Sequence, residues 1–105
     1  MQIKIVENSF FAHMATRVMK CNSVAIVFGK SIHLWNVSRK DFLRNPSWVA
    51  HELKHVRQYE RYGFGPFCCL YLLESVRKGY YKNRFEVDAR TAEERGPDLS
   101  GIEFV

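Results

Sequence analysis

Two histidines and a glutamate stand at the spacing of a zinc-binding helix. Residues 51–55 read HELKH, so the two histidines are four positions apart and a glutamate follows the first. On an α-helix, side chains four residues apart lie on the same face, about 5–6 Å apart at their β-carbons. His51 and His55 could therefore bind one zinc ion, while Glu52, about 100° further round the helix, could act as a general base on a metal-bound water without binding the metal itself. This segment predicts a zinc site with hydrolytic chemistry.

The third zinc ligand has to come from outside this helix, because a catalytic zinc site uses three protein ligands and keeps one position open. No third histidine follows at the spacing of the three-histidine enzymes. A carboxylate is therefore favoured as the third ligand. The residues that remain open as candidates beyond the helix are His13, His33, Asp88 and the glutamates after Gly79, which include Glu86 and Glu93.

The elements that must position these side chains predict a single α+β domain spanning residues 1–105. Apolar alternation and β-branched runs indicate strands near 2–6, 23–28 and 31–36, the last two joined as a hairpin at Gly29 and Lys30. Capping residues, glycines and prolines indicate helices near 9–20, 38–44, 47–63, 67–78 and 82–95, with Ser47 capping the third of them, and leave a tail after residue 95. We expect a small antiparallel sheet followed by helices.

Composition and charge narrow the class of protein. The chain is 47% hydrophobic and 26% charged, as in an ordinary folded protein. Its net charge of +5 is spread along the whole chain with acidic residues between the basic ones, so we expect no nucleic-acid partner. Lys4 and Glu7 lie where a signal peptide would need apolar residues, and the three cysteines form no disulfide framework, so a cytoplasmic location is expected.

The longest apolar run predicts a buried helix. Residues 64–73 are about half the ~20 residues that a membrane-spanning helix needs. We therefore expect residues 67–73 to form a core helix behind the helix with the two histidines, and we expect no membrane partner.

The two motifs together resemble the small gluzincin-type zinc metallopeptidases, also called mini-gluzincins. The sequences HELKHVRQYE and, about 30 residues later, GYYKNRFEVDAR are similar to their active-site helix and glutamate helix. The resemblance covers residues 23–95 in the order of elements and implies a zincin-like fold. It implies Zn²⁺ as cofactor, His51, His55 and Glu86 as its ligands, and Glu52 as the catalytic base.

The same resemblance implies a peptide or protein substrate. In such folds an extended peptide would pair with the strand nearest the active-site helix, here residues 32–36. Tyr80 and Tyr81 precede the glutamate helix, and either hydroxyl could donate to the oxyanion of a tetrahedral intermediate; we select Tyr81 as the candidate. The leading interpretation is a zinc metallopeptidase, and the alternative is a zinc-binding structural or interaction module with a non-catalytic site.

Overall fold

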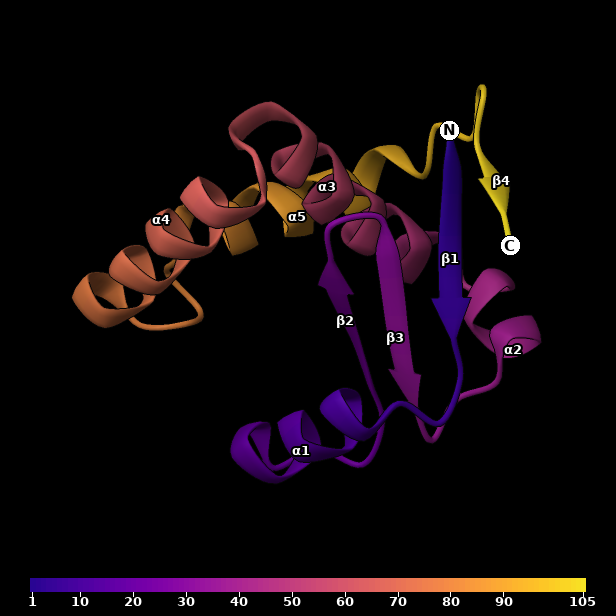
Figure 1. Cartoon of the computed structure of the whole chain (residues 1–105), viewed down its shortest axis with the longest axis horizontal. Helices are drawn as coiled ribbons and strands as arrows, with labels where there is room; N and C mark the ends of the chain where they lie inside the picture. Colours follow the sequence, from indigo (N-terminus) through magenta and orange to yellow (C-terminus); the bar gives the residue numbers. More distant parts are fainter.

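A four-stranded sheet in the order β2-β3-β1-β4 forms the centre of the structure, a computed structural model that describes all 105 residues (Figure 1). Its strands are β1 (Gln2–Val6), β2 (Val24–Phe28), β3 (Ser31–Trp35) and β4 (Glu103–Phe104). The helices are α1 (Phe10–Met19), α2 (Arg39–Leu43), α3 (Pro46–Tyr62), α4 (Phe64–Lys78) and α5 (Arg84–Arg95). The α+β class is as predicted from the sequence.

The sheet is mixed, so the prediction of a purely antiparallel sheet is wrong. β2 and β3 form the predicted antiparallel hairpin, with Phe28 opposite Ser31. β1 pairs in parallel with β3 and also with β4. The parallel pairing arises because α1 and β2 lie between β1 and β3 in the chain, which lets β3 return in the same direction as β1. The expected tail contains β4, whose two residues were too few to be predicted as a strand.

The position of β3 also corrects the expected peptide-binding strand. β3 lies between β2 and β1, so both of its edges are already hydrogen-bonded within the sheet. An added peptide cannot pair with residues 32–36. The free edge beside the longest helix, α3, belongs to β2, which ends the sheet on that side (Figure 1).

The hydrophobic core lies between one face of the sheet and the helices α2 and α3. It consists of nine buried residues: Ile3, Ile5, Val27, Ile32, Leu34, Phe42, Val49, Leu53 and Val56. α1 packs on the opposite face, where His13 stacks on Trp35 with 4.0 Å between the ring centroids. The sheet and α2 thereby fix one face of α3 and leave its other residues free to face α5.

Asn45 caps the start of α3, so the prediction that Ser47 caps this helix is wrong. The Asn45 side chain accepts a hydrogen bond from the Trp48 amide at 3.2 Å, and Pro46 occupies the first helical position. Proline favours that position because its missing amide would have no partner there and its φ angle is already helical. The sequence Asn-Pro therefore begins this helix instead of only ending the previous one.

The helix α4 is largely exposed, so the prediction of a buried core helix over residues 67–73 is wrong. Phe67 is its only buried residue. Leu72 and Val76 are 64% and 84% exposed, and α4 extends away from the sheet (Figure 1). No helix in the structure has the length and apolar character needed to cross a membrane.

Candidate metal centre

The two sequence motifs meet where α3 packs against α5. His51 and His55 direct their Nε2 atoms at the carboxylate of Glu86, to which the N–O distances are 3.1 and 3.2 Å. Glu86 is 3% exposed and His55 is 7% exposed, so this contact is largely closed to solvent. Residues separated by about thirty positions therefore form one cluster of two imidazoles and one carboxylate.

Glu52 lies beside the two histidines. One nitrogen or oxygen atom from each of His51, Glu52 and His55 lies within 4.8 Å of the others, close enough to surround one metal ion. Burial raises the pKa of Glu52 to about 7, although the two histidines oppose this rise. A carboxylate with a pKa near neutrality is well matched to accepting and releasing a proton at physiological pH.

The outer nitrogens of both histidines have their own acceptors. The Nδ1 atom of His55 donates to the Oε1 atom of Gln58 at 2.9 Å, and the Gln58 amide nitrogen donates to the backbone carbonyl of Phe85 at 3.1 Å. The Nδ1 atom of His51 donates to Glu93 at 2.9 Å. Because Nδ1 bears a proton in both rings, the Nε2 atoms are the ones available to a metal.

The charges in the cluster are coupled. Burial opposes a positive charge on His51, but hydrogen bonds to Glu86 and Glu93 and the nearby Glu52 carboxylate raise its pKa to about 9. The pKa of His55 is also raised, since Glu86 again outweighs burial. Burial alone would raise the pKa of Glu86, but the hydrogen bonds from the two histidines hold it well below its ordinary value. Without a metal, the negative charge of Glu86 thus favours the protonated form of both imidazoles.

Further side chains hold the Glu86 carboxylate and its helix. The Tyr71 hydroxyl of α4 donates a hydrogen bond to Glu86. Asn83 is fully buried; its side-chain oxygen caps α5 by accepting from the Phe85 amide, and its amide nitrogen donates to Tyr71 and Ser75 of α4. α4 therefore holds Glu86 and the start of α5 in place through these hydrogen bonds, although most of its apolar surface is exposed.

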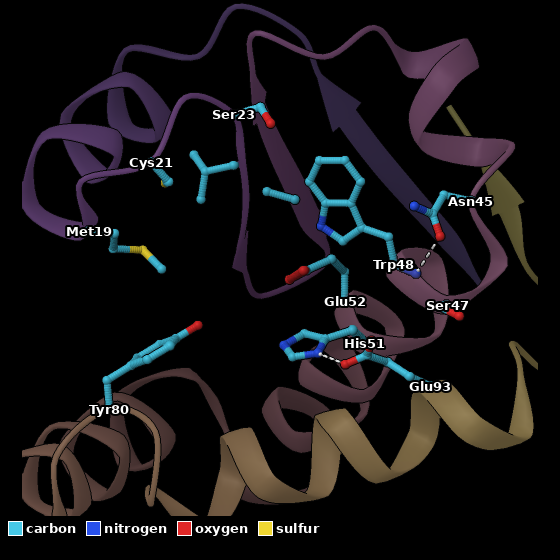
Figure 2. Close-up of a pocket in the computed structure, with 12 residues that line it drawn as sticks. Met19, Cys21, Ser23, Asn45, Ser47, Trp48, His51, Glu52, Tyr80 and Glu93 are labelled. Carbon is cyan, nitrogen blue, oxygen red and sulfur yellow. Dashed lines mark hydrogen bonds and ion pairs between the residues drawn. The ribbon is translucent and has the colours of Figure 1, made fainter.

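The two predicted tyrosines have different surroundings. Tyr81 is 73% exposed, and the guanidinium of Arg90 lies 4.1 Å from the centroid of its ring. Tyr80 lines the cleft that contains His51 and Glu52 (Figure 2). The structure thus does not bring Tyr81 to the site and places Tyr80 there instead. Adjacent tyrosines before a helix gave no signal to distinguish the two.

The other candidate ligands lie elsewhere, with one exception. The Nδ1 atom of His33 is hydrogen-bonded to the hydroxyl oxygen of Ser9 at 2.7 Å, and, like His13, His33 lies on the face of the sheet covered by α1. Asp88 is exposed and lines a separate hollow with Lys54. Glu93 is the exception, as described above. Gln58 was not considered from the sequence, and its position three residues after His55 was the signal available for it.

The cluster opens into a cleft of about 460 Å³. Figure 2 shows His51, Glu52 and Trp48 on one side, the edge strand β2 beside them, and Met19 and Tyr80 near the opening. The cleft thus gives a molecule from solution access to the Glu52 side of the histidine cluster.

Comparisons with known proteins gave no relative. No family model, no curated protein and no solved structure matches this chain significantly.

Proposed function

We propose that this protein is a zinc-dependent peptidase that hydrolyses peptide bonds in the cleft between α3 and β2. The observation that supports it is the convergence of His51, His55 and Glu86 on one point with Glu52 beside them and a cleft in front. A purely structural zinc site would be closed by a fourth protein ligand and would need neither a buried free carboxylate nor a cleft.

The donor set fits a catalytic zinc ion. Two imidazole nitrogens and one carboxylate are a ligand combination of catalytic zinc sites, and the outer hydrogen bonds of both histidines are those that orient metal ligands. His51, His55 and Glu86 would hold the ion. Zinc in such a site supplies a Lewis acid that polarises a carbonyl group and lowers the pKa of water.

Glu52 supplies the proton transfer. Its carboxylate lines the cleft, and its pKa of about 7 leaves an appreciable unprotonated fraction at neutral pH. In hydrolysis it would take a proton from the attacking water and release it to the amine that leaves the scissile bond. Tyr80, which lines the same cleft, is the hydroxyl donor best placed to bind the substrate carbonyl oxygen.

The free edge of β2 offers the binding site for the peptide backbone. In a two-residue hairpin the residues that flank the turn are hydrogen-bonded to each other, so the backbone groups of Phe28 pair with those of Ser31. Because backbone groups along a strand point alternately to its two edges, the N–H and C=O groups of Ala25 and Val27 point to the free edge of β2. The carbonyl of Val27 accepts a hydrogen bond from Tyr59 at 3.1 Å. Ala25 lines the cleft, and its backbone groups would pair with an extended peptide.

Replacing Glu52 with glutamine tests this proposal. The purified protein, loaded with zinc, is assayed against a library of fluorescence-quenched peptides, and bound zinc is measured by elemental analysis. We expect Glu52→Gln to retain zinc and to lose turnover by at least a hundredfold, as removal of a general base predicts. Glu60→Gln, an exposed substitution on the same helix, is the matched control and should retain both.

Two results would contradict the proposal. Absence of bound zinc from the wild-type protein after reconstitution would remove the metal centre itself. Zinc binding without turnover in the wild-type protein would instead assign the site to the alternative class, a zinc-binding structural or interaction module.

A further inference from the structure

Two helices of the structure expose long apolar side chains. On α1 these are Phe10, Phe11, Met14 and Val18, with exposed fractions between 52% and 82%. On α4 they are Phe64, Leu72, Leu73 and Val76, with exposed fractions between 54% and 84%. Single exposed apolar residues are ordinary, but rows of them along two helices indicate a surface that binds something apolar.

Basic residues accompany these apolar rows. Residues 10–20 and 64–82 together contain five of the 16 basic residues of the chain but only one of its 11 acidic residues. These thirty residues therefore account for four of the five net positive charges. The one acidic residue, Glu74, forms an ion pair with Lys78 at 3.2 Å. The remaining basic residues, Arg17, Lys20, Arg77 and Lys82, form no ion pair.

The two helices lie on either side of the cleft. α1 and α4 extend to the same side of the molecule, beyond the end of the sheet formed by β2 (Figure 1). Met19 at the end of α1 and Tyr80 just after α4 face each other across the opening of the cleft (Figure 2). A surface that contacted both helices would therefore also lie at the entrance to the site.

We propose that α1 and α4 bind together to the surface of an anionic lipid membrane, with the opening of the cleft toward that surface. Apolar side chains flanked by lysine and arginine are the composition of helices that lie in the lipid–water interface. A second copy of the chain is disfavoured as the occupant because it would bring two surfaces of the same positive charge together. A lipid surface can also receive two separate apolar rows at once without a shaped groove.

This binding mode differs from a membrane span. The sequence-based expectation of no membrane partner rested on the shortness of the apolar run, which excludes only a crossing helix. Interfacial binding needs an exposed apolar face with basic residues near it, and the exposure of the apolar side chains becomes visible only in the folded structure. The proposal does not depend on zinc or on hydrolysis, so it is tested on the metal-free protein.

The test is cosedimentation of the full chain with vesicles. One set contains only phosphatidylcholine, and the other contains 30% phosphatidylserine. We expect binding to the anionic vesicles at least tenfold stronger than to the neutral ones, because each basic residue at such a surface adds about fivefold. Raising the salt concentration to about 0.5 M should weaken this binding by screening.

Two sets of variants separate the apolar contribution from the charge contribution. The substitutions Val18→Ser, Leu72→Ser and Val76→Ser, combined in one protein, should reduce binding at least tenfold. Val87→Ser with Leu99→Ser, which are also exposed apolar positions but lie outside α1 and α4, is the matched control and should bind as wild type. Arg17→Gln with Lys82→Gln should weaken binding to anionic vesicles only, and it keeps the test decisive if the serine variant fails to fold.

Three results would overturn the proposal. The first is no binding to either kind of vesicle. The second is binding that all of these substitutions leave unchanged. The third is a wild-type dimer in light scattering that the serine variant converts to a monomer, which would identify a second copy as the occupant.

Discussion

Replacing Glu86 with glutamine should weaken zinc binding by about two orders of magnitude. Glu86 is buried, and its carboxylate contacts the Nε2 atoms of both His51 and His55. Binding of zinc to protein sites of four ligands is worth about 10–16 kcal/mol, so one ligand accounts for about 3 kcal/mol, or roughly a hundredfold in affinity. Glutamine has nearly the shape of glutamate but lacks the charge, which limits the change to the metal centre.

Two other carboxylates of α5 provide the comparison. Glu93 contacts only the outer nitrogen of His51, and its side chain is 36% exposed, so Glu93→Gln should weaken zinc binding by about tenfold. Asp88 is exposed and away from the cluster, so Asp88→Asn should bind zinc as wild type. The assay is competition for zinc against a chromogenic chelator at pH 7. A Glu86→Gln variant with wild-type affinity, combined with a loss in either of the others, would refute the assignment.

Three further predictions concern pH and stability. Because the pKa of His51 is raised to about 9, zinc must displace a proton from this ring when it binds below pH 9. The zinc affinity should therefore rise about tenfold per pH unit between pH 6 and 8 for each proton displaced. A zinc affinity that does not change with pH in the chelator titration would contradict this prediction. Phe42→Ala should lower the free energy of unfolding by about 3–5 kcal/mol in urea denaturation, because Phe42 is fully buried in the core. Asn83→Ala should lower it by about 2 kcal/mol in the same measurement, through loss of the α5 cap and of two hydrogen bonds to α4, whereas exposed Lys82→Ala should change it little.

Local signals in the sequence predicted the helix with the histidine pair and the hairpin. Helical spacing places His51 and His55 on one face of their helix independently of the rest of the fold. Gly29, with φ of +61°, supplies the tight turn between β2 and β3. The contact between Glu86 and the histidines could not be derived from spacing alone. It was expected from the resemblance of two motifs, because nothing local distinguishes a buried glutamate from an exposed one.

Features that depend on distant partners were missed. The direction of β1 in the sheet depends on a crossover that alternation in the sequence does not encode. The exposure of α4 was missed because an apolar run shows that a helix prefers burial but does not show whether the fold provides a surface to bury it. The choice between Tyr80 and Tyr81 likewise depends on which ring faces the cleft, and both have the same neighbours in the chain.

The pairing of β1 with β4 has a consequence for how the chain folds during synthesis. Gln2 lies opposite Glu103, so this pair of strands cannot form until the hundred residues between them and Glu103 itself have left the ribosome. Until then, β1 can pair only with β3, and its other edge stays open to unwanted strand pairing. The two-residue β4 should therefore form last and exchange its amide hydrogens first, while the hairpin of β2 and β3, which needs only nearby residues, can form early.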